Sequence, residues 1–189
     1  MTAKIKLNAA SGGGSISIQA PSSSSNNRVM TLPDTADGNI VPSNYGNSFL
    51  AYLSADAAIA TSTTTAVVCN TEVFDIGGVY DTSNGRFTPN VAGIYWVKAQ
   101  VLWSGSSSAT NNAYYQTFIN KNTAGQIRDI IHIDKQDWWT SQCSGLLELN
   151  GSSDYISMEV YQNRGGTENI EGDHRSKTTF EAYWVRALS

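Results

Sequence analysis

The sequence predicts an all-β fold: a jelly-roll sandwich of about ten strands, preceded by a short extended β arm. Two observations predict it. Short runs rich in β-branched and aromatic residues recur from residue 47 onward, with Gly, Pro, Asn and Asp between them. No segment of that region shows the apolar period of a helix. Residues 47–189 are therefore expected to form one jelly-roll head.

The predicted strands follow from their boundaries. Asn84-Gly85 is a strong signal for a type I′ hairpin turn, which needs positive φ at both central residues. Pro89 cannot donate a ladder hydrogen bond, so it ends the short strand before it. Gly93 then opens the long run IYWVKAQVLW. The strands are expected at residues 49–54, 66–68, 71–76, 86–88, 94–103, 113–120, 126–133, 143–149, 155–163 and 178–187.

Residues 1–46, the arm, are unlike the rest of the chain. AKIKLN and SISIQA alternate polar with apolar residues, and RVMTLPD is a third short apolar piece. SGGG and PSSSSNN, which separate them, are flexible turn material. Strands this short bury too little surface to fold alone. We therefore expect the arm to need other copies of itself or a partner.

Two long strands carry large apolar side chains on both faces. In IYWVKAQVLW, Trp96 and Leu102 lie on one face and Tyr95 and Trp103 on the other, and TTFEAYWVRA repeats the pattern. A sheet with one solvated face would alternate apolar with polar residues. We therefore expect one face to form the sandwich core and the other to be covered by another subunit.

Charge and hydropathy exclude several classes of function. Charged residues are only 15% of the 189 residues and the net charge is −4, which argues against nucleic acid as the main partner. No apolar window of about 18 residues occurs, so we expect no membrane insertion. Residues 1–20 contain no apolar segment typical of a secretion signal, so export by that route is not expected.

No catalytic constellation is found. His132 lies on a predicted strand and His174 in a predicted loop, and neither a G-x-S-x-G elbow nor a glycine-rich phosphate loop occurs. The carboxylates are scattered at turns, where Asp favours the backbone geometry. A glycosidase pair of carboxylates stays open, because its spacing exists only in the fold. We expect no enzymatic activity and no cofactor.

One stretch resembles a known family signature. Tyr80-Asp81, Gly85, Phe87-Thr88-Pro89 and Gly93-Ile94-Tyr95 look like the signature of the complement component 1q globular head. SFLAYLS, EVFDIGGVYD, GLLELNGSSDYISMEVYQN and TTFEAYWV are similar to strands of that family in order and spacing. The family shares a trimeric jelly roll with tumour necrosis factor, so the resemblance implies a homotrimer. Members often hold calcium near the trimer axis, for which this sequence identifies no ligands.

The arm carries a second resemblance. IKLNAASGGGSISIQAPSSSSNNRVMTLPDTADGNIV looks like the leader of tail fibres and other virion proteins of tailed phages, especially those of marine and cyanobacterial hosts. Such leaders consist of a strand, a GGGS link, a second strand, APSS and then TLPD. The resemblance implies a place on the virion, with assembly in the host cytoplasm and contacts to other virion proteins through residues 1–46.

Strand order predicts which loops share an end of the head. In an antiparallel jelly roll, successive loops alternate between two ends. The long loops at 104–112, 134–142 and 164–177 then lie at the far end, with those at 55–65 and 82–85. The short turns and both termini lie at the base. Binding residues tend to gather in long loops on a rigid scaffold, so the far end is the expected binding end.

Trp138 and Trp139 are the candidate receptor-binding residues. Flat indole rings stack on sugars, and Gln136, Asp137 and Gln142 could bond hydroxyl groups beside them. The alternative is that one tryptophan caps the trimer axis or the end of the sandwich.

The two cysteines, Cys69 and Cys143, lack the spacing of a metal site. Two small buried hydrophobes are the favoured interpretation, and a disulfide is the alternative. The strand count places Cys69 at the base and Cys143 at the start of a strand at the far end. Since a disulfide needs Cα atoms within about 7 Å, we expect both thiols to be unbonded.

These observations together predict a homotrimeric phage virion protein, a tail fibre or tail-tip protein whose head binds a host-surface glycan or protein. The alternative is a capsid decoration or cement protein, or another structural virion protein, without receptor binding.

Overall fold

The computed structural model describes residues 4–8, 11–19, 46–104, 113–133 and 138–188. The chain divides into two compact units, Met1–Ile40 and Val41–Ser189. Each unit is described by itself. The described residues form no helix of the length and hydrophobicity needed to span a bilayer.

The first unit contains one antiparallel hairpin. Its strands are β1 (Lys4–Asn8) and β2 (Ser15–Gln19), whose register pairs Ile5 with Ile18 and Leu7 with Ile16. Gly12 and Gly13 in the connection both have positive φ, which explains the glycine-rich link. Ile5 and Leu7 are mostly exposed. The third predicted arm piece, RVMTLPD, lies outside the described residues.

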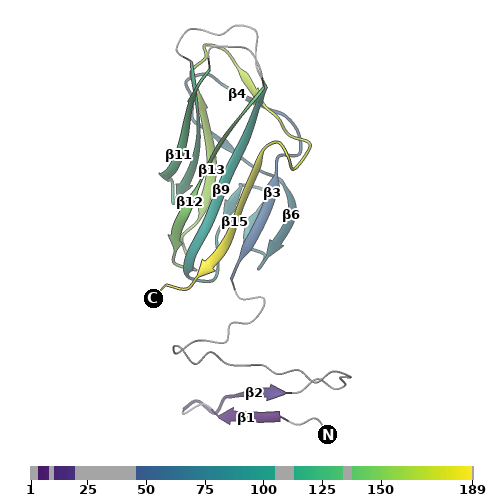
Figure 1. Ribbon diagram of the computed structural model, residues 1–189, viewed down its shortest axis with the longest axis vertical. Coiled ribbons are helices and arrows are strands. Elements are labelled where there is room, and N and C mark those ends of the chain that lie inside the picture. Colours follow the sequence, from purple (N-terminus) through teal and green to yellow (C-terminus); the bar gives the residue numbers. More distant parts are fainter. Residues whose placement is uncertain (1–3, 9–10, 20–45, 105–112, 134–137, 189) are drawn as a thin grey trace. The chain divides into compact units, whose positions relative to one another are not determined.

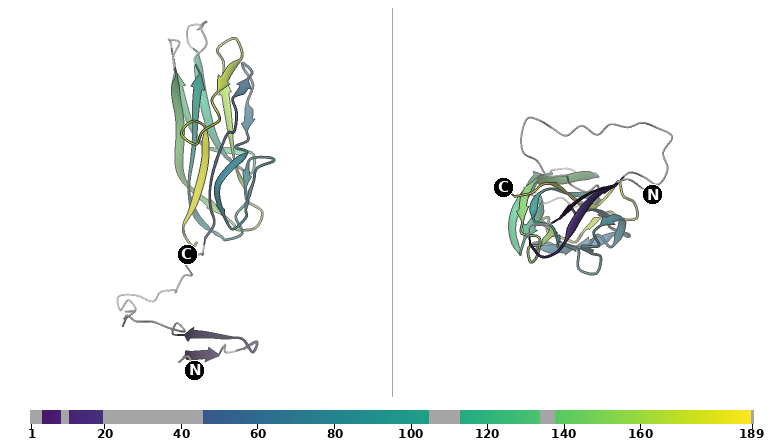
Figure 2. Two further views of the ribbon diagram at one scale, coloured as in Figure 1. Left: turned by 90° about the vertical axis from the view of Figure 1, so that its right-hand side faces the viewer. Right: turned by 90° about the horizontal axis from the view of Figure 1, so that it is seen from below.

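The second unit, the head, is a sandwich of two antiparallel sheets (Figure 1, Figure 2). In the described residues the first sheet has seven strands, in the order β4 (Ala57–Ile59), β14 (Glu168–Ile170), β9 (Gly93–Ser104), β15 (Thr179–Arg186), β3 (Ser48–Tyr52) and β6 (Thr71–Ile76), with β12 (Trp139–Leu149) also paired to β9. The second has six: β11 (Ala124–His132), β10 (Tyr114–Lys121), β13 (Ile156–Gln162), β8 (Arg86–Phe87) and β7 (Tyr80–Asp81), with β5 (Thr65–Val67) also paired to β13.

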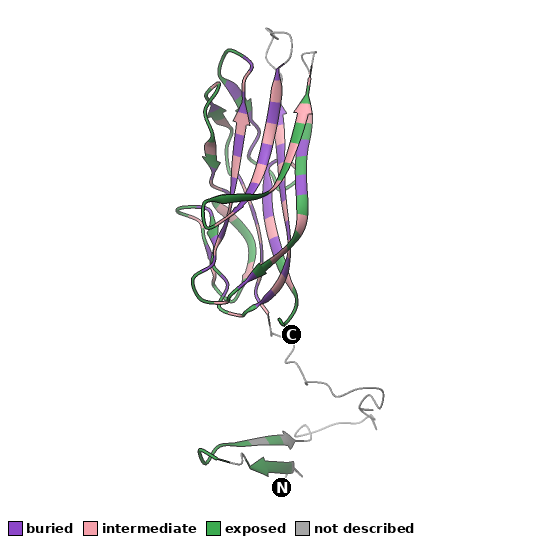
Figure 3. Cartoon of the chain, turned by 90° about the vertical axis from the view of Figure 1, so that its left-hand side faces the viewer, coloured by how far each residue is buried: buried purple, intermediate pink, exposed green. Residues whose placement is uncertain are grey.

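The core lies between the two sheets, where buried residues alternate along the strands (Figure 3). Every second residue of β9, from Gly93 to Trp103, is buried. Phe49 is the centre of an aromatic cluster: its ring centroid lies 4.3 Å from Tyr80, 4.7 Å from Phe87 and 5.2 Å from Phe180. The all-β jelly roll expected from the sequence is confirmed.

All of the predicted head strands form, but some boundaries differ. β12 begins at Trp139, four residues before the predicted start at 143, because its ladder follows β9 from Trp103 to Gly93. Three short strands, β4, β7 and β14, were not predicted. Segments of two or three residues carry no periodicity, so only their tertiary partners define them.

The hairpin turn after β7 is not the predicted type I′ turn. Gly85 has positive φ, but Asn84 does not. The Asp81 carboxylate accepts hydrogen bonds from the backbone N–H of Ser83 at 2.9 Å and from Asn84 Nδ2 at 2.6 Å. These hydrogen bonds favour a longer loop than a two-residue turn, because they give the loop's polar groups hydrogen-bond partners. A Cβ on Gly85 would approach the Val67 carbonyl to 3.2 Å, so glycine also suits the space.

The head has a base end and a far end, as predicted from strand order. The 82–85 turn was predicted at the far end, and this is wrong: Phe87 pairs with Ile156 next to the base turn, and Gly85 lies beside Val67, which pairs with Met158. At the base end β3 begins and β15 approaches its end, since Ser48 pairs with Tyr183. At the far end β9 ends and β12 begins, since Trp103 pairs with Trp139. The turn 150–154 therefore lies at the base, and β14 lies at the far end because Asn169 pairs with Ser104.

Both cysteines are buried and unbonded, but their predicted positions at opposite ends are wrong. Cys143 lies in the middle of β12, opposite Ala99, and Phe180 flanks Ala99 on the other side. The Cys69 thiol forms a hydrogen bond with the backbone of Phe180. The thiols therefore lie at one level of the core, about two strand spacings or 10 Å apart. That lateral separation, and not the length of the sandwich, keeps them apart.

Candidate binding surfaces

Trp139 closes the far end of the sandwich core. Its ring lies edge-on to Tyr115, with 4.7 Å between centroids, and Tyr115 contacts the buried Trp103 in the same way at 4.8 Å. The guanidinium carbon of Arg164 lies 6.0 Å from the Trp139 ring centroid. Trp139 therefore has the capping position at the sandwich end that the sequence left open as the alternative.

A buried polar cluster lies beside Trp139. Arg164 Nε is 3.4 Å from Glu168 Oε1, and its Nη1 donates to the Tyr115 hydroxyl at 2.9 Å. Gln162 accepts a hydrogen bond from the Arg164 backbone at 2.7 Å and donates to the carbonyl of Ile59 at 2.9 Å. Burial raises the pKa of Tyr115, and the hydrogen bond from Arg164 offsets this only in part. We call Arg164, Glu168, Tyr115 and Gln162 the far-end bracket, because they join four segments at this end.

The structure places the remaining predicted site residues apart. Trp138 is 58% exposed at the far end. Gln142 lies on β12 opposite Gln100, on the outward face of the sheet. Four extended residues separate it from Trp138, which is about 13 Å. Gln136 and Asp137 lie outside the described residues. Trp138 is thus the predicted site residue that presents an aromatic ring at the far end.

The outward face of the seven-stranded sheet carries an apolar row near the base. Trp96 on β9 pairs with Leu146 on β12 and with Tyr183 on β15. Leu146 is 61% exposed and Tyr183 is 50% exposed. Across β3 the row continues to Ile76 on β6, which is 49% exposed. We call Leu146, Trp96, Tyr183 and Ile76 the outer band.

Polar side chains on β9 and β15 bound the outer band on the far-end side, while on β6 the exposed Phe74 extends the apolar surface. In the next row, Lys98 Nζ lies 3.6 Å from Glu181 Oε1. The row beyond it contains Gln100 and Gln142. An apolar strip bordered by polar residues is the composition of a protein interface, with an apolar centre and a polar rim. Sequence reasoning found this face from its two-faced strands but could not say which residues share a row.

No metal site is found among the titratable side chains in the part of the chain that the structure describes. No group of three or more His, Cys, Asp or Glu residues there is placed to hold a metal ion. His174 lies in the far-end segment, with its Nδ1 2.8 Å from Ser176 Oγ. His132 is exposed on β11. The calcium site implied by the family resemblance stays a prediction.

Comparison with known proteins identifies the family. The model of the C1q domain family matches residues 48–185. The head has the C1q/TNF-like jelly-roll fold, and the chain belongs to the C1q domain family. No curated protein matches the sequence significantly.

Solved structures share the fold at low sequence identity. Murine APRIL at pH 5.0 is 12% identical, with a TM-score of 0.56 over 74% of this chain and 99% of that chain. Eiger TNF from S. frugiperda is 8% identical, with a TM-score of 0.51 over 76% of this chain and 94% of that chain. The globular domain of zebrafish complement 1qA is 13% identical, with a TM-score of 0.47 over 76% of this chain and 98% of that chain.

Proposed function

We propose that this chain is a homotrimeric virion protein of a tailed phage, a tail fibre or tail-tip component whose far end binds the host surface. In this proposal residues 1–46 attach the protein to other virion proteins. Two observations support the proposal: a C1q head at residues 48–185, and a leader similar to those of phage tail proteins ahead of it.

The outer band is the observation that best supports a trimer. It places exposed aliphatic and aromatic side chains in one row across β12, β9, β15 and β6. Covering a large apolar side chain contributes about 1.5 to 3 kcal/mol, and each subunit of a trimer covers several. The sheet face is then an interface between copies of this chain, and the far end is left for contacts with the host.

Trp138 is the residue with which we test host binding. Trp138→Ala on intact particles should lower host attachment at least tenfold, because a few aromatic anchors carry most of the affinity and three copies amplify each loss. Trp138 is better suited than Trp139, whose ring packs in the core and whose removal would disturb the fold. Ser153→Ala in the exposed base turn is the matched control and should attach normally.

The same particles distinguish receptor binding from the alternative role as a decoration or cement protein. If Trp138→Ala particles attach normally while deletion of the whole chain lowers particle stability, the protein is a decoration or cement component and the receptor-binding proposal is wrong. Native light scattering of each variant should give three times the 20.4 kDa chain mass, so that a lost trimer is not read as lost binding.

A further inference from the structure

The outward face of the six-stranded sheet carries a cluster of aromatic rings. Tyr114 on β10 stacks on Tyr161 of β13 with 5.5 Å between ring centroids. His132 of β11 lies 5.7 Å from Tyr114 on the other side. A hydrogen bond to Tyr161 raises the pKa of Tyr114, so the two hydroxyl groups also contact each other. Three strands thus present one continuous aromatic surface near the far end.

Polar and aromatic side chains alternate along this face. Phe118 follows Tyr114 by four residues on β10, about 13 Å along the strand, and Gln116 lies between them. Arg128 and Glu159 flank Phe118 on the two neighbouring strands. No described residue makes a hydrogen bond or ion pair with the side chains of Gln116, Arg128 or Glu159. The hydrogen-bond donors and acceptors of these three side chains, which lie between the aromatic rings, are therefore available to a ligand.

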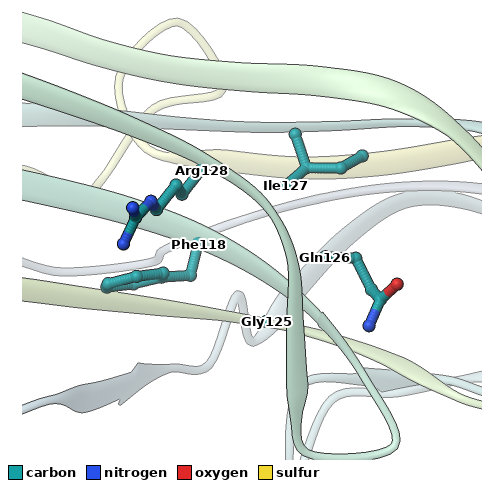
Figure 4. A pocket seen from close by; sticks show the side chains of 5 residues that line it. All are labelled: Phe118, Gly125, Gln126, Ile127 and Arg128. Atoms are coloured by element: carbon teal, nitrogen blue, oxygen red, sulfur yellow. The ribbon is translucent and has the colours of Figure 1, made fainter.

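The face is hollowed next to Phe118. A cavity of about 200 Å³ is lined by Phe118, Gly125, Gln126, Ile127 and Arg128. Figure 4 shows Phe118 and Arg128 projecting side by side from neighbouring strands, while Ile127 points away from them. A Cβ on Gly125 would lie 3.5 Å from Asn120 Oδ1, in ordinary contact. The aromatic cluster and this cavity lie on one surface, defined by Tyr114, Tyr161, His132, Gln116, Phe118, Arg128 and Glu159, which we call the tyrosine face.

We propose that the tyrosine face is a binding site for a neutral oligosaccharide. A sugar ring presents a flat apolar face, which fits an aromatic ring, and a rim of hydroxyl groups, which fit uncommitted amide, guanidinium and carboxylate groups. The alternation from Tyr114 through Gln116 to Phe118 supplies both along a line of about 13 Å, the reach of a short oligosaccharide.

Charge favours a neutral ligand. Arg128 and Glu159 contribute one positive and one negative charge on either side of Phe118. A phosphate or an acidic sugar would gain no net attraction, because the Glu159 carboxylate offsets the Arg128 guanidinium. A nucleic-acid strand, which also stacks on aromatic rings, needs a positive groove that this face lacks. The inference concerns a different surface from Trp138 and does not depend on the place of the protein on a virion.

The test measures saccharide binding by the full-length protein in solution. Isothermal titration with maltohexaose, cellohexaose, chitohexaose and mannohexaose should show binding of at least one of the four. The double variant Tyr114→Ala/Tyr161→Ala should weaken that binding at least tenfold. Arg128→Ala/Glu159→Ala, which removes only polar groups at the surface, should weaken it severalfold. Tyr52→Ala is the matched control, because Tyr52 is half-buried on β3 of the other, seven-stranded sheet.

Each outcome decides the proposal. Light scattering and thermal unfolding confirm that every variant compared is a folded assembly. Binding that survives both double variants would place the site elsewhere. Wild-type protein that binds none of the four hexasaccharides at millimolar concentration would overturn the saccharide assignment. If no saccharide binds but a peptide does, and the Tyr114→Ala/Tyr161→Ala variant loses that peptide, the ligand of the tyrosine face is a protein and not a saccharide. Particle attachment plays no part, so failure of the virion proposal leaves this result intact.

Discussion

Burial raises the pKa of both cysteine thiols, Cys69 and Cys143, to about 12. At pH 8 both are therefore protonated and inaccessible, and the thiolate is the reactive form. Iodoacetamide should leave the folded protein unmodified over an hour at pH 8 and should add two groups per chain in denaturant without reductant. Intact-mass spectrometry reads both results. An unfolded chain that takes up no label would reveal a disulfide and contradict the core arrangement.

Asp154 should contribute stability that depends on pH. Desolvation raises its pKa, but hydrogen bonds from Asn122, Lys121 and the Asn150 backbone outweigh this and lower the pKa from 3.8. A carboxylate with a lowered folded-state pKa stabilises the fold above its unfolded-state pKa, and that stability is lost as the pH falls through the folded-state value. Asp154→Ala should therefore cost about 1 to 3 kcal/mol at pH 7, and progressively less below about pH 3.8.

Urea unfolding at fixed protein concentration measures this difference. Ser153→Ala, in the same turn but exposed, is the control and should change the midpoint little. A penalty for Asp154→Ala that is the same at pH 7 and at pH 2.5 would show that lost packing, and not the charge, is responsible.

Single residues show where sequence reasoning reached its limit. The aromatic pair Trp138 and Trp139 was expected to act together, but the start of a strand sends the two rings to different places: one exposed, one in the core. Gln142 was expected beside them and lies on a sheet face. The Tyr114–Tyr161 stack was missed because 47 residues separate its members. The alternation of Tyr114, Gln116 and Phe118 indicated one face, but only the register of β13 shows what lies beside it.

At the scale of elements, the far-end bracket joins the end of β13 to β14. Arg164→Ala would leave Glu168 buried without its cation, and breaking a buried ion pair in this way costs about 3 to 5 kcal/mol. Arg164→Met combined with Glu168→Leu removes both charges and should recover most of that loss, because neither charge is left unpaired. Arg175→Ala, exposed in the same far-end segment, is the control.

Urea midpoints of the variants decide whether the bracket stabilises the far end as described. If Arg164→Ala unfolds at the wild-type midpoint, the buried pair makes no net contribution. If the double variant is no more stable than Arg164→Ala, the polar contacts to Tyr115 matter more than the balance of charge.

Most of the longer elements were predictable from their own residues, with β12 as the exception. TEVFDI was predicted with its observed bounds, and IYWVKAQVLW within one residue at each end, because long β-rich runs between glycine, proline and asparagine leave little choice. β4 forms by pairing with β14, and β14 by pairing with both β4 and β9 at the far end, which no local pattern indicates. The longer β12 likewise follows from its partner β9, and not from its own residues.

At the scale of the whole molecule, the outer band predicts the assembly. Leu146→Glu should dissociate the proposed trimer, because it places a charge without a partner in an apolar interface. Ile130→Glu is the matched control: Ile130 is 40% exposed on the other sheet and should leave the assembly intact. Light scattering at micromolar concentration should give a mass near 20.4 kDa for the first variant and three times that for the second.

Two results would contradict this assignment of the interface. Wild-type protein with the mass of one chain would exclude a stable trimer. A trimer that persists in Leu146→Glu but is lost in Ile130→Glu would move the interface to the six-stranded sheet, and the tyrosine face would then be covered.

The placing of both chain ends of the head at its base has a consequence for how such proteins diversify. Since β3 begins and β15 finishes there, a single junction ahead of residue 46 joins the head to any preceding segment. Recombination at that one point can exchange whole heads between unrelated stems without cutting a strand. The far end, free of chain termini, can accept insertions in its connections while the ladders beneath it stay unchanged.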